Sequence, residues 1–89
     1  QPIMNPATGG EVGTLHLGDA STVDRAVQVA AAAQKEWGSV SLAKRTQVLY
    51  RMRQLIIEHT DEIAEVISRE HGKTVGDTKG EIARGLETL

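Results

Sequence analysis

The chain has 89 residues, enough for one small domain at most, and any independent core would be marginal. It contains no cysteine, which excludes disulfides, thiolate metal sites and a cysteine nucleophile within these residues. A net charge of −2 and the lack of any apolar run of about 18 residues argue against a nucleic-acid binder and a membrane protein. The hydrophobic residues are mostly Ala, Val, Leu and Ile, with only Trp37 and Tyr50 as aromatics, which favours a mainly α-helical chain.

Residues 1–20 predict a β-hairpin segment. Both prolines of the chain lie in its first six residues and disfavour a helix there, and residues 5–10 are dense in turn formers. The imperfect alternation over residues 11–17 predicts a strand, paired with residues 2–4. Because a lone two-stranded ribbon is hardly stable in water, we expect this hairpin to pack against another element.

Residues 21–89 predict about four helices. The first opens at Ser21, which forms a capping box with Asp24, and it ends at Gly38. Its apolar positions recur at helical spacing and are Val23, Ala26, Val27, Ala30, Ala33 and Trp37. The alanine-rich surface of this helix would let a neighbouring element approach closely.

A second helix is predicted from Ser39 or Ser41 to about His59. Thr60 is the expected N-cap of a third helix, which closes at Gly72. The positions expected to be buried are Leu42, Leu49, Met52, Leu55 and Ile56 in the second helix and Ile63, Val66 and Ile67 in the third.

Charge is distributed unevenly over these two helices. Residues 41–59 carry four basic residues and one acidic residue, a net charge of +3, whereas residues 60–72 carry a net charge of −3. This pattern fits two helices packed antiparallel with complementary rims. It equally fits ordinary solvated helix faces.

The last segment predicts a fourth helix, with Thr78 and Glu81 as its capping box. Its apolar stripe, which includes Ile82 and Leu86, is still running at Leu89. Since the chain also starts without Met, we expect it to be a fragment truncated at Leu89.

Two motifs suggest chemistry but favour a structural interpretation. Gly72-Lys73-Thr74 looks like the tail of a phosphate-binding loop, yet a helix precedes it and Ile67 stands where that loop needs glycine. A helix C-cap is therefore favoured. The three histidines share no ligand spacing, so we expect no metal site.

Arg84 is the one candidate binding residue. Gly80 and Gly85 flank it on a predicted helix, and each helical glycine costs about 1 kcal/mol relative to alanine. Close approach by another element or a ligand would explain that cost, and the guanidinium could then grip a carboxylate through two parallel hydrogen bonds. The alternative is a surface arginine near a frayed chain end.

Five sequence blocks, in order, resemble the aldehyde dehydrogenase superfamily. They are Asn5-Pro6-Ala7-Thr8-Gly9, Val12-Gly13, Val23-Asp24-Arg25-Ala26-Val27 with Trp37, Arg45 with Leu49, and Glu70-His71-Gly72-Lys73-Thr74. Within that superfamily, residues 41–45 and 80–87 are similar to CoA-acylating methylmalonate-semialdehyde dehydrogenases. The resemblance covers essentially the whole chain.

The resemblance implies an NAD-dependent enzyme with a Rossmann-like domain, a catalytic domain and an oligomerisation arm. Residues 1–20 would be a hairpin segment, and residues 21–89 would be the helical part of the N-terminal cofactor-binding domain of an α/β fold. The catalytic cysteine, the oxyanion-hole asparagine and the residues that contact NAD would lie beyond Leu89. We therefore expect the 89 residues to bind neither NAD nor CoA and to be inactive alone. Arg84 matches the residue thought to hold the substrate carboxylate.

The resemblance also implies partners and a location. They are the rest of the enzyme chain, a small semialdehyde, a homotetramer at full length, and the cytoplasm, or the mitochondrial matrix in a eukaryote. Two alternatives stay open. One is a non-acylating aldehyde dehydrogenase with broader substrates, and the other is a free-standing helical module that binds a partner through its alanine-rich face.

Overall fold

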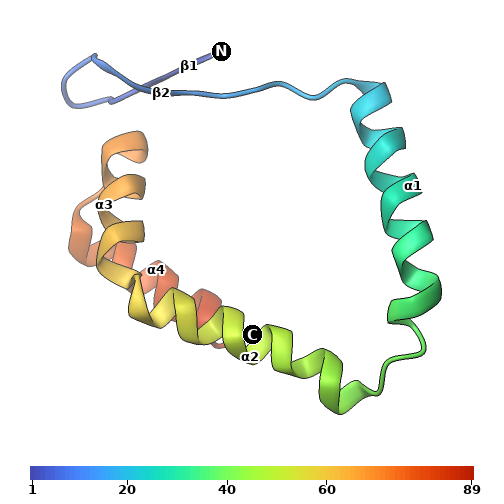
Figure 1. Cartoon of the computed structure of the whole chain (residues 1–89). Coiled ribbons are helices and arrows are strands. Elements are labelled where there is room, and N and C mark those ends of the chain that lie inside the picture. Colours follow the sequence, from blue (N-terminus) through green and yellow to red (C-terminus); the bar gives the residue numbers. More distant parts are fainter.

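The structure, a computed structural model, describes all residues from 1 to 89. Two short strands are followed by four helices (Figure 1). These elements are β1 (Pro2–Met4), β2 (Glu11–Thr14), α1 (Ala20–Trp37), α2 (Leu42–Glu58), α3 (Thr60–His71) and α4 (Val75–Leu86). The prediction of a mainly α-helical chain with an N-terminal hairpin is confirmed.

The hairpin is held by its turn as much as by its strands. β1 and β2 pair antiparallel with Ile3 opposite Gly13. The Asn5 side chain accepts a hydrogen bond from the amide of Ala7 at 2.8 Å, and Gly9 adopts a φ of +70° that glycine tolerates. The second strand is shorter than the predicted 11–17, since the last paired backbone is that of Leu15.

The hairpin turn rests on the C-terminal end of α3. Gly72 ends that helix in the left-handed conformation, at a φ of +83°, and its amide donates to the carbonyl of Ser68 at 2.9 Å. A Cβ added at Gly72 would lie 2.6 Å from Cγ of Pro6. The close fit of Pro6 on Gly72 gives the hairpin the support that a two-stranded ribbon needs.

The N-cap of α1 is Asp19, so the predicted capping box of Ser21 and Asp24 is wrong. The Asp19 carboxylate accepts from the amide of Thr22 at 2.8 Å and from the Ser21 hydroxyl at 2.7 Å. Ser21 lies inside the helix as a donor to the cap. A carboxylate that accepts several hydrogen bonds at the positive end of the helix dipole is the stronger cap.

The predicted caps of α3 and α4 are also wrong. The Thr60 hydroxyl donates backwards, to the carbonyls of Ile56 and Ile57 at the end of α2, at 2.8 and 3.0 Å. Thr74 caps α4 by accepting from the amide of Asp77 at 3.2 Å. α4 therefore starts one turn earlier than the predicted box places it, and Thr78 lies within the helix.

α3 packs against α4, and small side chains form the contact. Ala64 and Thr78 are fully buried, the only two buried residues of the chain. The Thr78 hydroxyl donates to the carbonyl of Thr74 at 3.0 Å and lies 3.4 Å from the Ser68 hydroxyl. The internal hydrogen bond satisfies the buried hydroxyl, so the two helices approach closely without an unpaired polar group.

Of the two arrangements that fit the charge pattern of residues 41–72, the antiparallel packing of α2 and α3 is not formed. α2 ends at Glu58 and α3 begins at Thr60, so only His59 separates them. One residue is too few to reverse the chain, and α3 instead leaves α2 at an angle (Figure 1). The ion pair between helices joins Lys79 of α4 to Asp61 of α3, at 2.7 Å.

The chain as a whole is open. Its radius of gyration is 17.3 Å, against about 12 Å for a compact domain of this length, and α1 stands apart from the other helices (Figure 1). The stripe predicted to be buried on α2 is exposed or half-buried, with Leu42 68% exposed. None of the helices combines the length and the apolar character that crossing a membrane requires.

Candidate functional site

One side of α4 and the turn before it form an open polar cavity of about 530 Å³. We call this surface the α4 polar face, and its residues are Lys73, Gly76, Asp77, Gly80, Glu81 and Arg84. They recur every three or four positions, which places them on one side of a helix. Two of the six, Gly76 and Gly80, are glycines, so no side chain projects into the cavity from these two positions.

Arg84 lies at the end of the α4 polar face, in the last turn of the helix. Its side chain is exposed, and it forms neither an ion pair nor a hydrogen bond. A Cβ added at Gly80 or Gly85 would meet no atom within 4 Å. The close approach expected at these glycines is thus not made by another element of this chain, and the space beside Arg84 is open to a ligand.

The other charged side chains of the face have partners. Lys73 pairs with Glu81, and Asp77 accepts from the Thr74 hydroxyl at 2.8 Å. The hydrogen bond and the charge of Lys73 lower the pKa of Glu81, and the charges of Arg84 and His71 add to that effect. Glu81 is therefore a carboxylate at neutral pH, and Arg84 alone is unpaired.

The contact between Lys73 and Glu81 was not foreseen from the sequence. The spacing of Glu81 from Thr78 fits a capping box and predicts that role for Glu81 instead. Lys73 lies before the helix, so no i,i+4 pattern connects the two residues. A usable signal would have been the Gly72 cap, which starts α4 at Val75 and places Lys73 beside its first turns.

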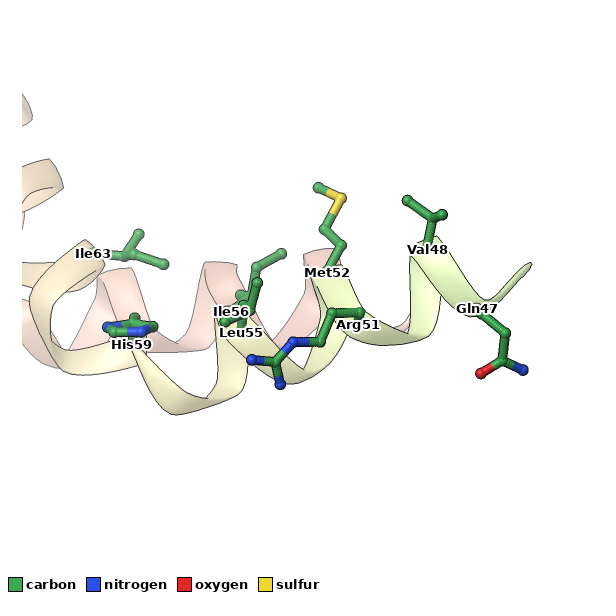
Figure 2. Close-up of a pocket in the computed structure, with 8 residues that line it drawn as sticks. All are labelled: Gln47, Val48, Arg51, Met52, Leu55, Ile56, His59 and Ile63. Atoms are coloured by element: carbon green, nitrogen blue, oxygen red, sulfur yellow. The ribbon is translucent and has the colours of Figure 1, made fainter. Parts of the chain in front are cut away.

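An apolar surface runs along α2 into α3. Figure 2 shows Val48, Met52, Leu55, Ile56 and Ile63 along it, with the polar side chains of Gln47, Arg51 and His59 at its edge. The hollow over this surface measures about 630 Å³. We call these five apolar residues the α2–α3 apolar surface. All of them except Val48 are among the side chains predicted to be buried. In this chain Val48, Met52 and Leu55 are exposed, and Ile56 and Ile63 are half-buried.

The residues present do not form a dinucleotide site. Gly72-Lys73-Thr74 follows a helix, and Gly72 serves as its C-cap against Pro6, as the sequence favoured. No strand leads into a glycine-rich turn ahead of a helix, which dinucleotide binding by a Rossmann fold requires. No three His, Cys, Asp or Glu side chains lie together as a metal site would need.

Comparison with known proteins gives a consistent picture over the whole chain. The family model described as "Aldehyde dehydrogenase family" matches residues 1–89. Malonate-semialdehyde dehydrogenase of Pseudomonas aeruginosa is 41% identical over 87 residues, which are 98% of this chain and 18% of that protein.

Two further relatives are named for two different substrates. Malonate-semialdehyde dehydrogenase of Bacillus pumilus is 36% identical over 89 residues, all of this chain and 18% of that protein. The 3,6-anhydro-alpha-L-galactose dehydrogenase of Streptomyces coelicolor is 46% identical over 80 residues, 90% of this chain and 16% of that protein. The chain thus spans less than a fifth of the length of these relatives.

Proposed function

Because this chain belongs to the aldehyde dehydrogenase family, an oxidoreductase family, we propose that it is the N-terminal portion of a CoA-acylating malonate- or methylmalonate-semialdehyde dehydrogenase. That enzyme oxidises a semialdehyde to an acyl-CoA with NAD as the hydride acceptor. The 89 residues by themselves are inactive, since they contain no cysteine to attack the aldehyde.

Arg84 binds the substrate carboxylate in this proposal. The observation that carries it is the unpaired guanidinium on the α4 polar face, where the space beside it is open. An arginine fork matches a carboxylate in two parallel hydrogen bonds. Holding the carboxylate end of a semialdehyde directs its aldehyde carbon toward a nucleophile elsewhere in the enzyme.

The remainder of the enzyme chain covers the α2–α3 apolar surface and the exposed side of α1. Only Ala64 and Thr78 are buried here, whereas a helix with an apolar stripe normally buries it against a neighbour. Residues 1–20 and 21–89 serve as the hairpin and the helical part of the cofactor-binding domain. NAD and CoA bind to residues outside the chain, and the full-length enzyme forms a homotetramer.

A second candidate is a dehydrogenase with broader, non-acylating activity. The Streptomyces relative favours it, because its name specifies an anhydro-sugar instead of a malonate semialdehyde, and it is 46% identical to this chain over 80 residues. The malonate-semialdehyde relatives match longer stretches and are more numerous among those compared, which supports the first candidate. Membership of an enzyme family weighs against a free-standing interaction module.

The test is a substrate comparison in the full-length dehydrogenase that carries these residues. kcat/KM is measured for malonate semialdehyde and for 3,6-anhydro-L-galactose, with and without CoA. The ratio of interest is kcat/KM for malonate semialdehyde divided by kcat/KM for 3,6-anhydro-L-galactose. We expect Arg84→Leu to lower this ratio by about 10- to 100-fold, because hydrogen bonds to charged groups contribute about 1.5–3 kcal/mol.

The matched control is Arg69→Leu, an exposed arginine in the last turn of α3 that also has no ion pair. It should leave the ratio as in the wild type. An unchanged ratio in Arg84→Leu would remove Arg84 from the site. Release of the free acid instead of the acyl-CoA, when CoA is supplied, would select the second candidate.

A further inference from the structure

Glu81 lies one helical turn before Arg84, in the i,i+3 relation at which a glutamate and an arginine on a helix ordinarily pair. If it did so, it would occupy the guanidinium that the proposed function assigns to the substrate carboxylate. A carboxylate tethered on the same helix competes at high effective concentration with a free one. An arginine site beside a glutamate therefore works best where that glutamate is held elsewhere.

In this structure Glu81 is held by Lys73 and not by Arg84. Lys73 belongs to the turn between α3 and α4. The left-handed Gly72 before it turns the chain at the end of α3, and α4 begins two residues after Lys73. The ammonium and carboxylate side chains are 35% and 42% exposed, so the pair is partly shielded from solvent. Asp77, the other acidic group of the face, is bound by Thr74.

We propose that Lys73 is a positioning residue, which holds the Glu81 carboxylate and so keeps the Arg84 guanidinium free for the carboxylate of the substrate. This inference rests on the proposed function of Arg84. Lys73 does not touch the substrate, and it sets the affinity for carboxylated aldehydes through Glu81. The α4 polar face is thus selective for an anion although two of its four charged groups are acidic.

The first variant to test is Lys73→Met, in the full-length dehydrogenase and with the ratio of kcat/KM values defined above. Without Lys73, Glu81 is free to pair with Arg84. We expect the ratio to fall about two- to five-fold, because an exposed ion pair contributes at most about 1 kcal/mol. The fall should come from a higher KM for the semialdehyde. Lys73→Arg keeps the cation and should restore the ratio. Lys79→Met is the matched control, because Lys79 pairs with Asp61 away from this face.

The double variant Lys73→Met/Glu81→Gln decides between positioning and direct binding. Under our proposal, removal of the Glu81 charge cancels the effect of losing Lys73, and the ratio returns to at least the wild-type value. If the ratio stays low in the double variant, Lys73 contacts the substrate itself and the proposal is wrong. It is also wrong if Glu81→Gln alone lowers the ratio, because Glu81 then orients Arg84.

The same measurements separate the two levels of inference. If Arg84→Leu leaves the ratio unchanged, the proposed function of Arg84 fails and the role of Lys73 fails with it. If Arg84→Leu lowers the ratio but Lys73→Met does not, only the positioning role of Lys73 is overturned.

Discussion

Asp19 holds the start of α1, although the residue is exposed to solvent. Its carboxylate accepts from the hydroxyls of Ser21 and Thr22 and from the amide of Thr22, at 2.7, 2.9 and 2.8 Å. The bond from Ser21 has the largest effect, and together these bonds lower the pKa of Asp19 from 3.8 to about 2. All of these bonds favour the charged form of the carboxyl group, because a carboxylate accepts hydrogen bonds better than a carboxylic acid does.

This depressed pKa predicts how the start of α1 responds to acid. Because the pKa is lower in the folded chain than in the unfolded one, the contribution of Asp19 is complete above about pH 4 and is lost as the pH falls through 2. The ¹³C shift of the Asp19 carboxyl group and the amide shift of Thr22 should titrate together near pH 2. In Asp19→Asn the Thr22 amide should lose this titration, and a midpoint near 3.8 in the wild type would contradict the cap.

At the scale of elements, three residues define the turn between α3 and α4. Gly72 gives it a left-handed residue, Thr74 caps the next helix, and Thr78 fills the contact between the two helices. Pro6 of the hairpin closes over the same glycine. One residue thereby joins the hairpin to the helical pair.

Gly72→Ala should therefore weaken both connections. The left-handed conformation costs a non-glycine residue about 1–2 kcal/mol, and the new Cβ would also collide with Pro6. We expect faster amide hydrogen exchange at the end of α3 and loss of the contacts between Pro6 and Gly72 in NMR spectra.

Gly85→Ala is the control for that substitution. Gly85 lies in α4 with nothing within 4 Å of an added Cβ, so alanine should raise the helix content by its propensity advantage of about 1 kcal/mol. Far-ultraviolet circular dichroism should show opposite changes for the two variants. Equal changes would mean that Gly72 is not under conformational constraint.

At the scale of the whole molecule, the chain has helices but almost no core. Its dimensions are 49 × 32 × 15 Å, and the large apolar side chains of α1 and α2 are mostly exposed. Hydrophobic burial is the main favourable term in folding, and helices of this length are marginal in water without it. The four helices therefore leave most of their apolar side chains without cover from within this chain.

The isolated chain should consequently melt over a broad temperature range and bind a hydrophobic dye such as ANS. The control is the full-length dehydrogenase of the proposed function, which should melt sharply and bind little dye. Calorimetry and circular dichroism check the first point, and fluorescence checks the second. A sharp, two-state transition of the isolated chain would contradict this prediction and would favour a free-standing helical module.

The sequence by itself determined the features that depend on neighbouring residues. The turn at residues 5–10, the helical periods and the left-handed Gly72 follow from local sterics and spacing, and all of them are present in the structure. The resemblance to the aldehyde dehydrogenase family could also be recognised from the sequence, because it consists of short motifs in order along the chain.

Only the three-dimensional structure decided which groups meet when several partners, near or far in the sequence, compete. By spacing alone, a cap is predicted at Ser21, Thr60 and Thr78. The structure instead has Asp19 as the cap of α1 and Thr74 as the cap of α4. Several hydroxyls and carboxylates near each helix start compete for the same backbone amides, and spacing does not say which one binds. Lys73 pairs with Glu81 because of the turn at Gly72, which sets where Lys73 lies relative to α4. This pairing leaves Arg84 without an ion-pair partner. The sequence also did not predict which apolar side chains are buried. An apolar stripe indicates which side of a helix avoids water, but not which element covers that side.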